Sequence, residues 1–331
     1  MSGRVGSRLT GRIYHIPVMA EAVVALLAAA PAGVIVDGTL GGAGHSAALV
    51  EATDRLVVGV DQDPDALHEA SQRMTEASAQ GRFKTLHGNF RDLPALLESA
   101  ELPGEQGLAG ILLDLGVSSH QLDEASRGFA FRFPDAPLDM RMNPSEDCAT
   151  ARDLLETLDA VALMRVLREY GEVPRPDRVA RAIKQAVADE TMETTGDLAR
   201  VVEKAVPPRR SGGVHPATTV FQALRIAVNK ELEALDEVLT AAEQLLKPGG
   251  RLAVIAYHSL EDRRVKQHFR RGEQGPARPG HLPPPSDWVQ TWQVVTSKAL
   301  KASPEEIVEN PRARSARLRV AARPMHAGGA V

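Results

Sequence analysis

Cysteine is almost absent from this 331-residue sequence, which contains only Cys148. A single thiol cannot form a disulfide within the chain, so nothing in the cysteine content indicates an oxidising compartment. Cys148 lies in a polar stretch without a nearby histidine, and this favours an incidental cysteine over a catalytic nucleophile.

Long apolar runs are missing as well. The longest one near the start, residues 22–32, is too short to span a bilayer. It follows Glu21 and a segment containing His15 and Pro17, unlike the basic start of a signal peptide. We interpret the run as a buried amphipathic helix, and the sequence predicts a cytoplasmic protein without membrane association.

The sequence also lacks a strong net charge, which is −4. This average does not indicate a nucleic-acid binder, but the charge is distributed unevenly. Residues 204–230 contain five basic residues and no acidic one, and residues 261–331 contain 13 Lys and Arg against 7 Asp and Glu. Such stretches can contact phosphates if they share a face, although scattered solvated charge explains them equally well. The candidates for phosphate contact are Arg209, Arg210 and Arg225.

Short apolar runs alternate with helical patterns in the first part of the chain. Runs of this length, bounded by turn residues and separated by helices, predict a parallel sheet covered on both faces, and hence an α/β fold. The expected strands are 34–37, 56–60, 83–86 and 110–114, and the expected helices are 45–51, 64–79 and 93–100.

The alternation stops between residues 118 and 217, where only helical periodicity is found. The expected helices are 149–156, 160–170, 176–188 and 195–206, the last with Thr195 ahead of Asp197 as a capping signal. The sequence therefore predicts an all-helical insertion between the fourth and fifth strands.

The alternation resumes with a long helix, 219–246, closed by Lys247-Pro-Gly-Gly250. A strand at 251–257 and a helix at 260–271 follow, and residues 272–285 are expected to form a surface loop. Two last strands, 291–296 and 316–322, are expected to form an antiparallel hairpin at the sheet edge.

A glycine-rich turn, Asp37-Gly-Thr-Leu-Gly-Gly-Ala-Gly-His45, joins the first strand to the first helix. Glycines allow a tight turn and a close approach to a ligand at the helix N-terminus. Their positions do not fit the dinucleotide spacing Gly-x-Gly-x-x-Gly counted from Gly38. Asp61, at the end of the second strand, suits two ribose hydroxyls of either a nicotinamide cofactor or S-adenosylmethionine. The Pro-Gly-Gly before the fifth strand is typical of methyltransferase sheets and favours the latter.

Longer strings along the chain narrow this prediction. Together they resemble the bacterial family of 16S ribosomal RNA cytosine-N4 methyltransferases, over roughly residues 14–322. The strings are His15-Ile-Pro-Val-Met, Asp37-Gly-Thr-Leu-Gly-Gly-Ala-Gly-His-Ser46, Leu112-Leu-Asp-Leu-Gly-Val-Ser-Ser119, Gln121-Leu-Asp123, Arg127-Gly-Phe-Ala-Phe131, Pro137-Leu-Asp-Met-Arg-Met142, His215-Pro-Ala-Thr, Phe221-Gln-Ala-Leu-Arg225, His258-Ser-Leu-Glu-Asp-Arg263 and Glu309-Asn-Pro-Arg-Ala-Arg314.

The resemblance implies a class I, Rossmann-like S-adenosylmethionine methyltransferase domain, residues 1–117 and 218–331. A helical insertion, residues 118–217, would recognise the RNA. It also implies a cytosine target in the decoding region of 16S ribosomal RNA within the small ribosomal subunit. Carried over by position, the cofactor contacts are Ala43, Gly44, His45, Asp61, Phe90, Asp114 and Gln121. Ala43 stands where family members often have a third glycine.

Asp114 ends the fourth strand, where amine methyltransferases usually hold a group that orients the target nitrogen. The exocyclic amine of cytosine is a poor nucleophile, and a hydrogen-bond acceptor on its N–H would localise its lone pair. Asp114 is therefore the catalytic candidate. The double proline and stacking aromatic that commonly follow are missing here, so other residues must position the base. The candidates are Phe129, Phe131, Asp139, Tyr257, His258 and Ser259.

Other functions stay open at this point. The enzyme could methylate another amine, such as adenine N6 or a protein side chain. The chain could be a non-catalytic assembly factor that binds ribosomal RNA, or a nicotinamide oxidoreductase. The spacing of His, Cys and carboxylates predicts no metal site, and a homodimer would be compatible with the sequence.

Overall fold

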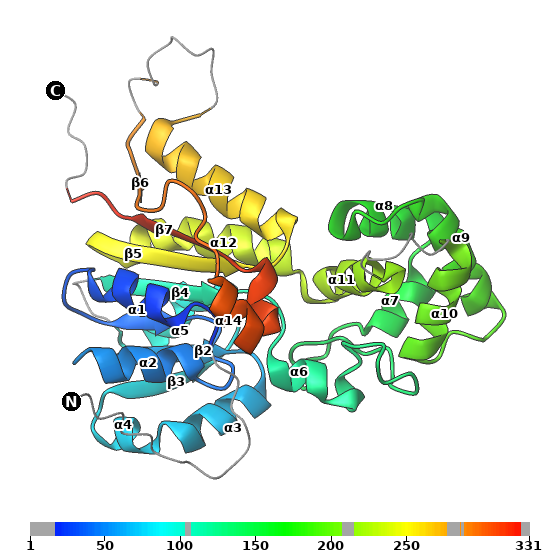
Figure 1. Ribbon diagram of the computed structural model, residues 1–331, viewed down its shortest axis with the longest axis horizontal. Helices are drawn as coiled ribbons and strands as arrows, with labels where there is room; N and C mark the ends of the chain where they lie inside the picture. The colour runs from blue at the N-terminus through cyan, green and yellow to red at the C-terminus, as the bar shows by residue number, and fades with distance from the viewer. Residues whose placement is uncertain (1–16, 103–106, 207–214, 277–284, 286–287, 326–331) are drawn as a thin grey trace.

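The computed structural model describes residues 17–102, 107–206, 215–276, 285 and 288–325. Its centre is a seven-stranded sheet in the order β3-β2-β1-β4-β5-β7-β6 (Figure 1). The first five strands run parallel, as the alternating pattern predicted. Their bounds are β1 Ile35–Asp37, β2 Val57–Asp61, β3 Phe83–His87, β4 Leu108–Asp114 and β5 Leu246–Ala256.

The fifth strand begins earlier than expected. Leu246 already pairs with Leu108, and regular pairing resumes where Arg251 pairs with Gly110. The residues between form a bulge, in which Gly249 has a φ of 76°, a backbone conformation suited to glycine. The Pro-Gly-Gly signal therefore marks an irregularity inside β5 and not its start.

The edge of the sheet is antiparallel, as predicted. β7 (Arg317–Ala322) pairs with β5 on one side and with the short β6 (Gln293–Val294) on the other. β6 is shorter than the predicted strand, and Trp292, just before it, is fully buried. The indole Nε1 of Trp292 donates a 3.0 Å hydrogen bond to Glu243.

Helices cover both faces of the sheet because neighbouring strand residues point to opposite sides. Ile35 of β1 packs in the cluster that includes residues of α1, α2 and α3, whereas Val36 packs in the cluster that includes residues of α5, α12 and α13. The helices are α1 Ala20–Ala28, α2 Gly44–Ala52, α3 Pro64–Arg73, α5 Leu93–Ser99, α12 Glu231–Leu245 and α13 Ser259–Gln274. The single helix predicted at 64–79 is divided into two helices, α3 and α4 (Thr75–Ala79), because the chain leaves helical geometry at Met74. In the described part of the chain, no helix has both the length and the apolar character needed to cross a bilayer.

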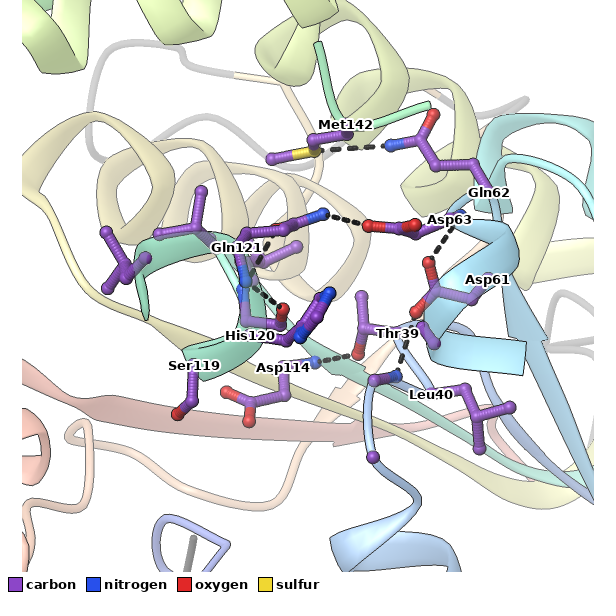
Figure 2. Close-up of a pocket in the computed structure, with 18 of the residues that line it drawn as sticks. Thr39, Leu40, Asp61, Gln62, Asp63, Asp114, Ser119, His120, Gln121 and Met142 are labelled. Carbon is purple, nitrogen blue, oxygen red and sulfur yellow. Dashed lines mark hydrogen bonds between the residues drawn. The ribbon is translucent and has the colours of Figure 1, made fainter. Parts of the chain in front are cut away.

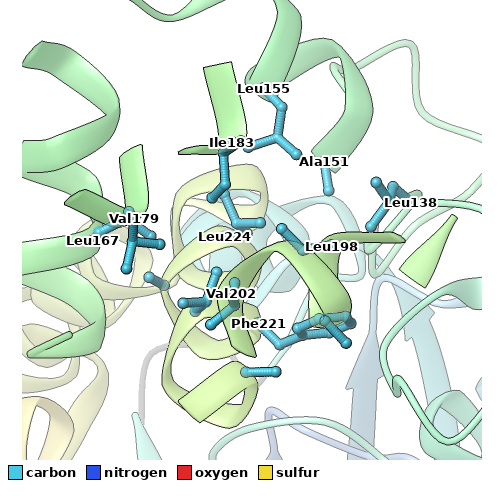
Figure 3. Packing of buried hydrophobic residues seen from close by; sticks show 14 of the residues in the cluster. Leu138, Ala151, Leu155, Leu167, Val179, Ile183, Leu198, Val202, Phe221 and Leu224 are labelled. Atoms are coloured by element: carbon cyan, nitrogen blue, oxygen red, sulfur yellow. The ribbon is translucent and has the colours of Figure 1, made fainter. Parts of the chain in front are cut away.

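The predicted helical insertion lies to one side of the sheet (green in Figure 1) and has its own apolar core (Figure 3). Thr150 and Thr194 begin two of its helices with reciprocal capping hydrogen bonds to Asp153 and Asp197. The capping residue of the last predicted helix is thus Thr194 and not Thr195. The helices are α7 Ala151–Thr157, α8 Ala160–Gly171, α9 Pro176–Ala188 and α10 Thr195–Ala205.

The single helix predicted at 219–246 is wrong. The structure has α11 (Pro216–Asn229) and α12, separated by Lys230 in the left-handed conformation, with φ 49°. The Asn229 amide stabilises this break, since Nδ2 donates to Met140 O at 2.8 Å and Oδ1 accepts from Met142 N at 2.7 Å. No glycine or proline marks the break, so periodicity alone could not locate it.

α11 contributes its apolar face to the core of the helical insertion. Phe221 and Leu224 are buried there among residues of α8 and α9 (Figure 3). α12 packs instead against the sheet. We therefore propose that the second boundary of the insertion lies near Lys230 and not between residues 217 and 218.

Candidate active site

A pocket of about 1170 Å³ opens at the carboxyl ends of the parallel strands. β1 and β4 are neighbours there although they are far apart in sequence, and such a point of reversal is where open α/β sheets bind ligands. One part of the pocket is lined by the glycine-rich turn and by residues after β2 and β4. Another part is lined by residues that follow β5 and by residues near the break between α11 and α12.

The glycine-rich turn leaves room for a ligand. Gly41 has a φ of 48°, and a Cβ atom added there would meet nothing within 4 Å. The turn is held from behind, because buried Asp37 accepts a 2.8 Å hydrogen bond from the Ser46 hydroxyl. Ala43 also has a left-handed backbone, with φ 58°, directly before α2. Glycine would avoid the steric cost that this conformation has for alanine.

Asp61 joins the turn to the end of β2. Its Oδ2 accepts a 2.8 Å hydrogen bond from Gly41 N, and its Oδ1 accepts a 2.9 Å bond from Asp63 N (Figure 2). Burial raises the pKa of Asp61 to about 6, although these two backbone donors oppose the shift. Each carboxylate oxygen keeps a further lone pair, so Asp61 can still accept hydrogen bonds from a ligand in the pocket.

Phe90 and Gln121 line the same part of the pocket. Phe90 begins the short helix η1 (Phe90–Asp92) and also packs against the apolar core of the sheet. Gln121 lies in α6 (Ser119–Asp123) and is buried; its Nε2 donates a 2.9 Å bond to Asp63 Oδ2, and its Oε1 accepts a 3.0 Å bond from Ser118 N. The amide of Gln121 is therefore engaged with the protein.

Sequence reasoning missed the importance of Asp63 and Arg127. The Arg127 side chain, 7% exposed, reaches Asp63, 2% exposed, at 2.8 Å. It also donates a 2.7 Å hydrogen bond to Met142 O. This buried ion pair connects the start of α3 to the part of the insertion that precedes its helices α7 to α10. In the sequence, the one sign of this ion pair was the presence of Arg127 in the string Arg127-Gly-Phe-Ala-Phe131.

Asp114 lies at the end of β4 with its carboxylate held from two sides. The Tyr257 hydroxyl donates a 2.7 Å hydrogen bond to Oδ1, and His45 Nδ1 lies 3.6 Å from Oδ2. The other ring nitrogen of His45 donates to Val18 O at 2.8 Å. Burial raises the pKa of Asp114 to about 6, although His45 and the Tyr257 hydrogen bond oppose the shift. Thr39 fixes the backbone, because its hydroxyl accepts a 2.6 Å bond from Asp114 N (Figure 2).

Of the six candidates for positioning a base, Tyr257 lines the pocket. The other five do not line it and stay predictions. Their environments are an apolar core for Phe129, stacking on His215 at 4.8 Å for Phe131, an ion pair with Arg141 for Asp139, the N-terminal cap of α13 for His258, and a hydrogen bond to Glu172 for Ser259.

The three arginines expected to contact phosphates do not form one described surface. Arg209 and Arg210 lie outside the described residues. Arg225 is directed inward, with 15% of its side chain exposed, and donates two hydrogen bonds of 2.8 and 2.9 Å to Glu231. This pair spans the break between α11 and α12. Arg225 therefore lines the pocket as one half of an ion pair, and its contact with phosphate stays a prediction.

The sequence of the chain is similar to those of known proteins. Residues 12–324 match the model of the MraW methylase family. The chain is 47% identical over 313 residues to ribosomal RNA small subunit methyltransferase H of Heliobacterium modesticaldum, covering 93% of this chain and 98% of that protein. It is 49% identical over 312 residues to the protein of the same name from Syntrophotalea carbinolica, covering 92% and 96%. The chain therefore belongs to the MraW methylase family.

Proposed function

We propose that this protein transfers a methyl group from S-adenosylmethionine to the exocyclic N4 of a cytosine in the decoding region of 16S ribosomal RNA. The observation that carries the proposal is the carboxylate of Asp114, held by Tyr257 and His45 inside the pocket that the glycine-rich turn and Asp61 also line. The names of the relatives support the small-subunit RNA as substrate.

The cofactor is expected to occupy the part of the pocket beside the glycine-rich turn. There the open space at Gly41 admits a ligand close to the backbone, and Asp61 offers acceptors to ribose hydroxyls. Phe90 provides an apolar surface for the adenine. When bound, S-adenosylmethionine supplies a methyl group already activated by its sulfonium. The proposed contacts are Ala43, Gly44, His45, Asp61, Phe90, Asp114 and Gln121.

Asp114 would orient the acceptor nitrogen. An ionised carboxylate accepts a hydrogen bond from the N4 amine, localises its lone pair and stabilises the positive charge that develops on nitrogen. The proton that the methylated nitrogen then releases can pass along this hydrogen bond to the carboxylate. The Tyr257 hydroxyl engages Oδ1 of Asp114, which leaves further lone pairs for the amine. Tyr257 and His45 thereby fix the carboxylate, and most of the catalytic effect comes from alignment of the reacting atoms.

A methyl-transfer assay on small ribosomal subunits tests this function. The subunits come from a strain that lacks the gene, the cofactor carries a labelled methyl group, and the modified base is identified by mass spectrometry. We expect the label on N4 of a single cytosine of 16S RNA. Label on adenine or on protein would overturn the proposed substrate, and bound subunits without any label would indicate a non-catalytic assembly factor.

The rate is expected to depend on the ionisation of Asp114. Because burial raises its pKa to about 6, protonation removes the acceptor as the pH falls through that value. We expect kcat to fall about tenfold per pH unit below pH ~6 and to level off above it. The pKa of Asp61 is raised to the same range, and its protonation would weaken cofactor binding. Measuring kcat at saturating cofactor separates the effect of protonating Asp114 from that loss of binding. A kcat that stays constant between about pH 5 and pH 7 would contradict the role of Asp114.

We further propose that the substrate is RNA within the small-subunit particle and that the enzyme acts in the cytoplasm. The basis of both proposals is the target itself, an RNA that small ribosomal subunits carry in the cytoplasm. Parallel assays on deproteinised 16S RNA and on subunits distinguish the two substrates. A homodimer is proposed from the sequence alone, and light scattering of the purified protein tests it.

A further inference from the structure

The string Glu309-Asn-Pro-Arg-Ala-Arg314 supplies none of the proposed cofactor contacts, yet two of its residues line the pocket. It forms the end of α14 (Pro304–Glu309) and most of η3 (Pro311–Ser315). Asn310 caps η3, accepting a 3.2 Å hydrogen bond from Arg312 N, and Ala313 is fully buried in the core that includes residues of α1. Glu306 of α14 accepts a 2.6 Å bond from Met19 N.

This anchoring separates the two arginines of the string. With Ala313 buried between them, Arg312 lines the pocket, whereas Arg314 is exposed to solvent. The Arg312 side chain is 35% exposed, and burial lowers its pKa. The fold therefore holds a partly desolvated cation in the pocket that contains Asp114 and Tyr257.

Within the part of the chain that the structure describes, the partners of Arg312 leave most of its hydrogen-bonding capacity unused. A guanidinium carries five N–H donors. Among the described residues, its side chain donates to the Ser119 hydroxyl, and its Nη2 lies 3.9 Å from Asp123 Oδ1. Asp123 Oδ1 is also paired with Arg132, so two arginines share one carboxylate. The two guanidinium groups therefore carry more positive charge than this carboxylate neutralises, and this side of the pocket is suited to an additional anion.

We propose that Arg312, together with Ser119, binds a backbone phosphate next to the target nucleotide. The inference rests on the proposed function, because a base that reaches Asp114 brings its own phosphates to the side of the pocket. Arginine and serine side chains are common phosphate ligands in nucleic-acid complexes, and such contacts orient the substrate without reading the base. Arg312 would then position the RNA and take no part in the chemistry.

The test compares Arg312→Gln with Arg314→Gln, a matched control from the same short helix. Binding of unmethylated small subunits is measured at several salt concentrations, and methyl transfer and cofactor binding are measured in parallel. For Arg312→Gln we expect a roughly tenfold higher KM for subunits and a salt slope reduced by about one. We expect kcat and the cofactor Kd to stay close to their wild-type values. Arg314→Gln should match the wild type, and Arg312→Lys should keep the salt slope.

Three results would overturn the phosphate contact. They are an unchanged salt slope in Arg312→Gln, an equal loss in Arg314→Gln, and a loss confined to cofactor affinity, which would assign Arg312 to the cofactor. A wild-type protein that binds subunits but transfers no methyl group would instead overturn the proposed function. Because the salt slope is a binding measurement, it tests the phosphate contact separately.

Discussion

Asp114→Asn is expected to lower kcat by about 10²- to 10⁴-fold, the range found when a positioned acid–base group is removed. Asparagine preserves the size of the side chain but is neutral, so it cannot balance the charge that develops on the acceptor nitrogen. In the wild type the two carboxylate oxygens face Tyr257 and His45, and the substitution replaces one of these oxygens with an NH₂ group. Single-turnover methyl transfer at saturating cofactor and subunits measures the effect.

Tyr257→Phe is the matched control for Asp114→Asn. It removes the 2.7 Å hydrogen bond to Asp114 but leaves the carboxylate in place. We expect kcat to fall about tenfold or less. In the wild type the Tyr257 hydrogen bond lowers the pKa of Asp114, so its removal should raise that pKa and shift the acid limb of the pH–rate profile to higher pH. Cofactor affinity, measured by calorimetry, separates binding from chemistry. Wild-type turnover by Asp114→Asn would rule out the proposed role of this residue.

Arg127→Met is expected to reduce the free energy of unfolding by about 3–5 kcal/mol, the usual effect of removing one partner of a buried ion pair. The substitution leaves Asp63, 2% exposed, as an uncompensated buried charge. Cofactor affinity should fall as well, because Asp63 also holds the Gln121 amide and donates its backbone N–H to Asp61. Urea unfolding monitored by circular dichroism measures the stability.

An exposed pair provides the control for Arg127→Met. Arg132 and Asp123 also pair, but both side chains are about half exposed, at 53% and 49%. Arg132→Met should therefore cost less than about 1 kcal/mol. The double variant Asp63→Asn/Arg127→Met should recover part of the loss, since no charge is then left unpaired. Equal destabilisation by Arg127→Met and Arg132→Met would show that burial of the Asp63 pair is unimportant.

The elements that the sequence predicted well are those with strong local signals. β2 and β4 are apolar runs that end in an aspartate, and those aspartates, Asp61 and Asp114, both reach the pocket. The glycine-rich turn is equally local, because glycine is the residue best suited to the backbone conformation at Gly41. These features depend on neighbours in the chain, and periodicity and residue type reveal them.

The features that the sequence did not predict depend on contacts between distant residues. Lys230 breaks a continuous helical pattern because the Asn229 amide bonds to Met140 and Met142, nearly ninety positions away. Arg225 was expected to meet phosphate but pairs with Glu231 across that break. No local signal distinguishes an arginine that points into a pocket from one that points to solvent.

The sequence by itself determined the family, the parallel sheet with its helical insertion, and the two strand-end aspartates of the pocket. Local propensity and residue order decide these features, because each element carries its own pattern of apolar residues and turns. The tertiary structure alone decided which side chains join those aspartates. Tyr257 and Arg312 reach the site of Asp114 from segments more than 140 positions later, and only the packing of β5 and η3 brings them there.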